Sequence, residues 1–205
     1  MTLRDTDVEP TGSSLKNRRV VLGVTGGIAA VETVRLARAL RREGADLLVI
    51  MTPSAQRIIT PLAVRWASQA EVITDWDGDL SALNKADAVV VAPATRDAMA
   101  SHVHGLQHGP LMMALSVARS RNTPTLFAPS MHLDLADDPV TDELVDAVRA
   151  QGAHVLWGPK EEGKRKTPSV ERLVAETAHL VNRNRPNRRN VVVTLGATRS
   201  AIDDV

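Results

Sequence analysis

Hydroxyl groups and glycines follow three apolar runs of the sequence, in the places where a nucleotide-binding fold contacts its ligand. "TGG" begins at Thr25 after "VVLGV", "TPS" begins at Thr52 after "ADLLVIM", and "PAT" begins at Pro93 after "ADAVVVA". Glycine lets the backbone approach a ligand, and hydroxyls beside free N–H groups at a helix start bind anions. No acid follows the second run, where a dinucleotide site needs one for its ribose. The pattern favours a phosphate monoester such as FMN over NAD, although a tight turn or an N-cap explains any one of these stretches alone.

Histidines supply the other candidate chemistry. His132 follows Met131 in "APSMHLDLADDP", after a fourth apolar run, where it is a candidate ligand-binding residue or an ordinary surface residue. His102, His104 and His108 form H-x-H-x₃-H. In a partly helical stretch the first two point apart and no carboxylate joins them, so we expect no metal site.

Composition narrows the function classes. The chain has 205 residues, a formal net charge of +1, one Phe, three Trp, and neither Tyr nor Cys. The charge and the few aromatic rings argue against nucleic acid as a partner. Absence of cysteine excludes disulfides and a thiolate nucleophile. No apolar run approaches the roughly 20 residues of a membrane helix. We therefore expect a cytoplasmic protein that binds no membrane.

The elements that must position these residues alternate along the chain. Apolar strands are predicted at 20–24, 45–51, 86–92, 124–128 and 153–158. Helices are predicted from residue 28 to Gly44, from Pro53, and at about 95–104, 110–119, 139–151 and 168–182. This alternation predicts an α/β fold: a doubly wound, mostly parallel sheet with helices on both faces.

The two ends depart from this plan. Residues 1–18 are polar and are predicted to form a disordered leader before a domain at 19–181. "NRNRPNRRN", 182–190, is basic and interrupted by Pro186, which is typical of a linker. "VVVTLGATRSAIDDV", 191–205, starts a new strand and glycine turn. It either docks on the first sheet or begins a second domain, and the linker favours the second.

Five motifs in order resemble the flavin-containing cysteine decarboxylase family: "GVTGGIAA", "MTPSAQRIITP", "APAT", "HG" at 104–105 and "PSMHLDLADDP". "PSMH" resembles the family's P-x-M-N motif. His in the Asn place, together with "EEGKRK" at 161–166, resembles the archaeal branch that acts on 4'-phosphopantothenoylcysteine in coenzyme A biosynthesis. Residues 191–205 are similar to the opening of a phosphopantothenate–cysteine ligase domain.

The resemblance implies a Rossmann-like flavoprotein with FMN as cofactor, and a lyase that decarboxylates phosphopantothenoylcysteine to 4'-phosphopantetheine. It implies a homotrimer, for which the apolar "PLMMALSVA" at 110–118 is a candidate contact helix. The FMN phosphate is expected at the helix starts near Gly27 and Pro53. The flavin-binding residues are expected to be Thr25, Gly26, Gly27, Ile28, Thr52, Ser54, Pro93, Ala94 and Thr95. Met131 and His132 are expected to bind the substrate carboxylate.

Three departures affect the catalytic residues. The family's catalytic His place is taken by Asp79, a carboxylate that can still act as base but has the near-neutral pKa of an imidazole only where burial raises it. The family's flap Cys is absent, and Lys164 or Lys166 could replace it as proton donor. "QHGPLMMA" at 107–114 replaces "A-D-D-L-L-S". Catalysis is therefore assigned to His132, Asp79 and Lys164. The alternatives are a flavin-binding homologue without activity, a flavin prenyltransferase-like protein and an NADP-binding module.

Overall fold

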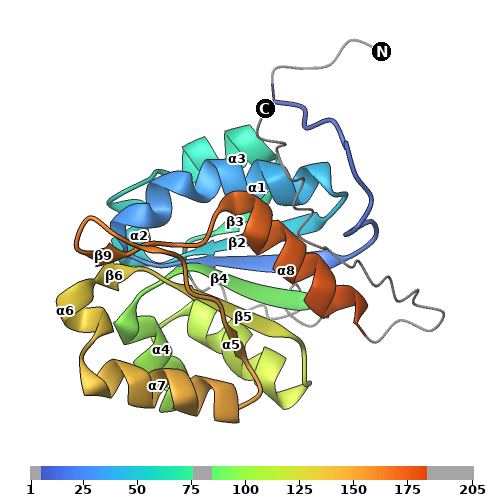
Figure 1. The fold of residues 1–205 in the computed structure, drawn as a ribbon. Coiled ribbons are helices and arrows are strands. Elements are labelled where there is room, and N and C mark those ends of the chain that lie inside the picture. Colours follow the sequence, from blue (N-terminus) through green and yellow to red (C-terminus); the bar gives the residue numbers. More distant parts are fainter. Residues whose placement is uncertain (1–5, 76–84, 184–205) are drawn as a thin grey trace, which may run out of the picture.

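The computed structural model describes residues 6–75 and 85–183 (Figure 1). Their main sheet has six parallel strands in the order β3-β2-β1-β4-β5-β7. The strands are β1 (Arg19–Val24), β2 (Asp46–Met51), β3 (Glu71–Ile73), β4 (Ala88–Ala94), β5 (Thr125–Pro129) and β7 (His154–Val155). The predicted doubly wound α/β fold is confirmed.

Helices cover both faces of this sheet. One face carries α1 (Thr33–Arg42), α3 (Pro61–Ser68) and α8 (Val170–Asn182), and the other carries α4 (Arg96–Val103), α5 (Pro110–Ser120) and α7 (Pro139–Ala150) (Figure 1). Two apolar cores lie between the sheet and these layers. Because both faces of β1, β2 and β4 are covered, these strands are continuous apolar runs without a polar alternation.

Several short elements were not predicted. The chain after Gly27 first forms a five-residue 3-10 helix, η1 (Ile28–Glu32), before α1 begins. The helix that starts at Pro53 is only α2 (Pro53–Gln56), because α3 begins anew at Pro61 with Thr60 as its N-cap. β3 was also missed, since three residues give no measurable periodicity.

The strand order places a switch point between β1 and β4. The chain moves outward to β2 and β3 on one side and to β5 and β7 on the other. Crossovers on opposite sides leave a crevice beyond the carboxyl ends of these two strands, and ligands of open α/β sheets bind in such crevices. The segments that begin at Thr25 and Pro93 lie at this point.

A small antiparallel sheet stands beside the crevice. It contains β6 (Met131–His132), β9 (Lys164–Arg165) and β8 (Lys160–Glu161), in that order. β8 and β9 form a hairpin whose two turn residues, Glu162 and Gly163, both have positive φ angles, as a type I′ turn requires. The basic stretch 161–166 is thus an ordered hairpin that packs against the strand carrying His132; four-residue α6 (Leu133–Ala136) follows that strand.

The amino-terminal segment corrects one expectation. The side chain of Leu15, placed in the leader from the sequence, is fully buried in the first apolar core. The Ser14 hydroxyl donates to the Glu43 carboxylate at 2.8 Å, and the Asn182 side chain donates to the Ser14 carbonyl at 2.8 Å. The folded domain therefore includes the end of the segment assigned to a leader. One buried leucine in a polar stretch gives no periodic signal that could have shown this.

Asn182 also extends the last helix one residue beyond the predicted domain end. The rest of the predicted linker from residue 184, and the predicted start of a second domain, lie outside the described residues. Across the described parts of the chain, none of the helices combines the length and apolarity that crossing a membrane requires.

Candidate active site

The first of two cavities at the switch point has a volume of about 490 Å³; we call it the glycine-side cavity. It is lined by the turn after β1, by α2, by one face of α4 and by the start of α5. Its lining residues are Thr25, Gly26, Thr52, Pro53, Ser54, Thr95, Asp97, Ala98, Ser101, His108, Leu111 and Met112. Five of the nine residues predicted to bind flavin are therefore brought together on one wall.

Thr25 ties the two central strands together. Its hydroxyl donates to the Pro93 carbonyl at 2.8 Å and accepts from the Thr95 backbone N–H at 2.9 Å. A hydroxyl has one hydrogen to donate, so this one is already used within the protein. Thr25 thus fixes the turn after β1 against the turn after β4.

Thr52 and Thr95 are N-caps whose donors remain available. The Thr52 oxygen accepts from the Ala55 N–H, and the Thr95 oxygen accepts from the Ala98 N–H, each at 3.3 Å. Each cap uses a lone pair, and each hydroxyl hydrogen is left for another acceptor. Both the structural role and an anion-binding role are thus compatible with the same side chain.

Gly26 is required by a close approach of two backbones. A Cβ added here would lie 2.3 Å from the Ser54 Cβ, closer than real atoms come. A Cβ at Gly27 would lie 3.6 Å from the Pro93 Cγ, an ordinary contact. The absence of a side chain at Gly26 therefore lets the turn at residues 52–54 approach the turn after β1.

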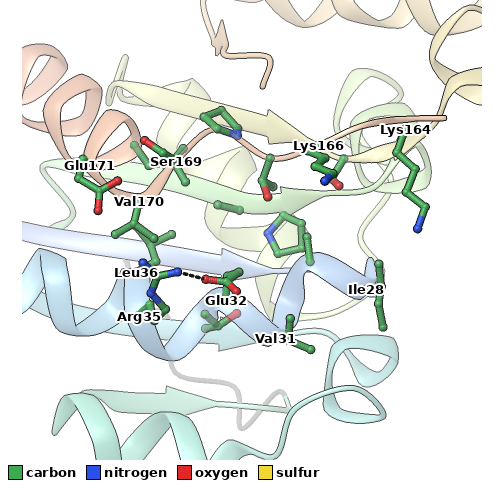
Figure 2. A pocket seen from close by; sticks show the side chains of 18 of the residues that line it. Ile28, Val31, Glu32, Arg35, Leu36, Lys164, Lys166, Ser169, Val170 and Glu171 are labelled. Atoms are coloured by element: carbon green, nitrogen blue, oxygen red, sulfur yellow. Dashed lines mark hydrogen bonds and ion pairs between the residues drawn. The ribbon is translucent and has the colours of Figure 1, made fainter. Parts of the chain in front are cut away.

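The second cavity, about 390 Å³, lies on the other side of η1; we call it the lysine-side cavity (Figure 2). η1 and the start of α1 form one wall, and the β8–β9 hairpin with the segment leading into α8 forms the other. Figure 2 shows Lys164 and Lys166 across the cavity from Ile28 and Val31. Most of the cavity surface is apolar, and the ammonium groups stand at one side.

The two lysines differ in their pairing. Lys166 Nζ lies 3.1 Å from a Glu161 oxygen and 2.8 Å from a Glu162 oxygen. These hydrogen bonds, with Glu162 the stronger, raise the pKa of Lys166, and the Lys166 hydrogen bond lowers the pKa of Glu162. Lys164 makes no ion pair with the described residues. Its charge still contributes to lowering the pKa of Glu162, which lines the same cavity.

The hairpin holds Lys164 directly opposite His132. Register in the small sheet pairs His132 with Lys164 and Met131 with Arg165. The Arg165 side chain points the other way along the pleat, and its guanidinium carbon lies 4.7 Å from the Trp157 ring centroid. Two residues that the sequence separates by more than thirty positions thus form one cross-strand pair of nitrogen donors.

The structure distributes the remaining predicted residues differently. Ile28 and Pro93 line the lysine-side cavity, and Ile28 is 70% exposed. Ala94 is fully buried in the second core, and Met131 packs against that core. Asp79 lies outside the described residues.

Six side chains of the glycine-side cavity were missed as contacts: Asp97, Ala98, Ser101, His108, Leu111 and Met112. Helical spacing is the available signal for two of them. Asp97 and Ser101 are four residues apart on α4, which places their side chains on one face of the helix. His108 and the start of α5 reach the cavity only through tertiary packing, which no local pattern shows.

The three clustered histidines have separate environments. His102 is 4% exposed and packs on Phe127, with 5.1 Å between ring centroids, whereas His104 is exposed and His108 lines the glycine-side cavity. Burial, with the Arg119 charge second, lowers the pKa of His102 to about 4. In the part of the chain that is described, no three His, Cys, Asp or Glu side chains are grouped to hold a metal ion.

Comparison with known proteins identifies the family. Residues 8–182 match the family described as flavoprotein. The chain belongs to the flavoprotein family. Among its relatives, the coenzyme A biosynthesis bifunctional protein CoaBC of Thermococcus kodakarensis is 33% identical over 198 residues, which are 93% of this chain and 49% of the relative. CoaBC of Bacillus subtilis is 30% identical, over 93% of this chain and 50% of the relative. The chain thus spans about half the length of these relatives.

Solved structures show the same fold. A mutant PPC decarboxylase complexed with pantothenoylaminoethenethiol superposes with a TM-score of 0.71 at 19% identity, over 79% of this chain and 97% of that chain. The FMN-dependent cysteine decarboxylase TvaF from thioviridamide biosynthesis gives a TM-score of 0.68 at 25% identity, over 82% of this chain and 98% of that chain. This flavoprotein therefore shares the fold of these structures.

Proposed function

We propose that this domain is an FMN-dependent decarboxylase that converts 4'-phosphopantothenoylcysteine to 4'-phosphopantetheine in coenzyme A biosynthesis. The observation that carries the proposal is the pair of cavities flanking one glycine turn. One is lined by hydroxyls and glycine, and the other is mostly apolar and lined by Lys164, whose cross-strand neighbour His132 is exposed and lines neither cavity. The bifunctional CoaBC relatives and the FMN-dependent decarboxylase TvaF support it.

The glycine-side cavity fits a flavin phosphate. The cradle at Gly26 excludes any side chain, and Thr52 and Thr95 keep hydroxyl hydrogens to donate. The phosphate was expected at the starts of helices near Gly27 and Pro53, but the helices found there are short: η1 has five residues and α2 has four. So short a helix has little dipole, so hydroxyls and single N–H groups would hold the phosphate. Bound FMN would supply the oxidation and reduction that decarboxylation of the cysteine moiety needs.

The lysine-side cavity suits the substrate. Apolar walls from Ile28, Val31 and Val170 would contact the methyl-bearing pantothenoyl part. His132 and Lys164, opposite each other on β6 and β9, would donate to the carboxylate that is lost. Holding this group in position accelerates the step more than tight binding does. Lys164, as an ammonium, is also the candidate donor of the proton that replaces carbon dioxide.

A flavin-binding role without decarboxylation is the second candidate. It is favoured by the lack of any cysteine in the chain, since bacterial members of the family use a flap Cys. The test is carbon dioxide release from phosphopantothenoylcysteine by the FMN-loaded protein. Release supports the enzyme, whereas bound FMN without release supports the second candidate. Protein that binds no FMN contradicts both.

We also infer a homotrimer, with a revised contact surface. The helix suggested for the contact, α5, buries Leu111, Met112 and Leu115 in its own core. Exposed apolar side chains lie elsewhere, with Leu62 at 71% and Trp66 at 55% on one face of α3. Sedimentation of wild type and Trp66→Glu tests the inference. A trimer that Trp66→Glu weakens supports it, and a wild-type monomer contradicts it.

A further inference from the structure

Among the described residues, no permanent cation lines the glycine-side cavity. Neither Lys nor Arg is among its lining residues, which come from the turn after β1 and from α2, α4 and α5. Arg96, next to the cavity on α4, is paired with Asp138 on α7. Arg and Lys are frequent partners of phosphate groups, and a nearby positive charge strengthens phosphate binding beyond what hydroxyls and N–H groups supply. This cavity offers only hydroxyls, N–H groups and two ionisable side chains.

Those two side chains are Asp97 and His108. Asp97 is in the first turn of α4, and His108 lies two residues before α5. Their side chains make no ion pair within the described residues, so neither neutralises the other at contact distance. A carboxylate repels a bound phosphate, and an imidazole attracts it only when protonated. Imidazole is the side chain that ordinarily changes charge between pH 5 and 8.

We propose that His108 is the cationic group of this cavity and that its protonated form strengthens the binding of the FMN phosphate. The inference rests on the proposed function, because it takes FMN as the ligand. Oxidised flavin carries no charge on its ring system, so the phosphate is the charge that His108 acts on. We therefore expect FMN affinity to fall as pH rises, because a neutral imidazole no longer attracts the phosphate. Asp97 acts in the opposite direction at every pH at which it is ionised.

The test measures FMN dissociation constants by quenching of flavin fluorescence at pH 6 and pH 8 in low salt. At pH 6, His108→Gln should bind FMN about fivefold more weakly than wild type, the size expected of an exposed charge, and at pH 8 the two should agree. Asp97→Asn should bind more tightly at both pH values. The phosphate has its own ionisation near pH 6. It affects all variants alike, so the difference between variants isolates the imidazole.

His104→Gln is the matched control, because His104 is an exposed histidine four residues away that does not line the cavity. It should respond to pH as wild type does. Riboflavin, which lacks the phosphate, should bind wild type and His108→Gln equally. An unchanged pH response in His108→Gln, or an equal effect on riboflavin, overturns the inference and leaves the proposed function standing. A wild type that binds no FMN overturns both.

Discussion

The glycine-side and lysine-side cavities flank the same turn after β1 but are built in different ways. The first is formed largely by the segments that directly follow β1, β2 and β4. The close approach of Ser54 to Gly26 and the hydrogen bond from Thr25 to Pro93 hold these segments together. The second is closed by the β8–β9 hairpin, more than 125 residues further along the chain than η1 on its other wall. The difference teaches that the proposed cofactor site is a property of the sheet, whereas the proposed substrate site depends on a separate hairpin.

The strongest test of this contrast is Gly26→Ala against Gly27→Ala. The first should weaken FMN binding on the order of 100-fold, because its Cβ displaces the Ser54 turn by an ångström or more. The second should bind nearly as wild type, since its Cβ meets only ordinary contacts. Flavin fluorescence titration gives the affinities and circular dichroism checks the fold. Equal affinities in the two variants would place the phosphate elsewhere.

Substitution of His132, on the lysine side, should leave FMN binding unchanged and lower turnover. His132→Ala should lower the rate of carbon dioxide release by ~100-fold, as loss of one positioned donor does, with FMN still bound. His132→Asn should keep more activity than Ala, because an amide N–H can replace the imidazole N–H. If wild type and His132→Ala released carbon dioxide at the same rate, His132 would have no role in the reaction.

The hairpin lysine sharpens the comparison further. Lys164→Met should raise the KM for phosphopantothenoylcysteine by about tenfold through loss of a charged hydrogen bond. Lys160→Met is the control, because Lys160 is on the same hairpin but pairs with Asp137 and does not line the cavity. Steady-state kinetics separates KM from kcat. A large fall in kcat with an unchanged KM would instead support Lys164 as the proton donor.

The smallest effect concerns stability rather than either cavity. His102 has a folded-state pKa of about 4 because burial disfavours its charged form, whereas an unfolded histidine titrates near 6.5. The unfolded state therefore binds more protons between these values, so stability is full above pH 6.5 and falls as pH drops toward 4. In the wild type we expect this loss to lower Tm by roughly 5 °C. His102→Leu should remove much of it. Thermal melts at pH 7 and pH 4.5 test it, with His104→Gln as control. A decrease in Tm of equal size in His102→Leu would show that His102 does not cause the loss of stability at low pH.

Local patterns predicted the parts of the molecule in which neighbours in sequence are neighbours in space. The four longer strands, the helical layers on both faces and the hydroxyl turns all follow from apolar runs and their breaks, whereas the strand predicted at 153–158 is only the two-residue β7. Short elements escaped because two or three residues carry no period, as β3 and β6 show. Leu111 and Met112 escaped because α5 reaches the cavity through tertiary packing, and an apolar helix sequence is the same whatever the helix contacts.

What the sequence by itself determined is the sheet and the chemistry at its carboxyl edge, since burial on both faces demands continuous apolar strands and the turns after them must bind or cap. What only the tertiary structure decided is which of those groups remain available. The Thr25 hydroxyl is used in a hydrogen bond to Pro93, and Lys166 pairs with Glu162, whereas Lys164 makes no ion pair with the described residues. His108 lines a cavity that contains no Lys or Arg among its described lining residues. Availability depends on the partners that each polar atom finds, and those partners come from distant parts of the chain.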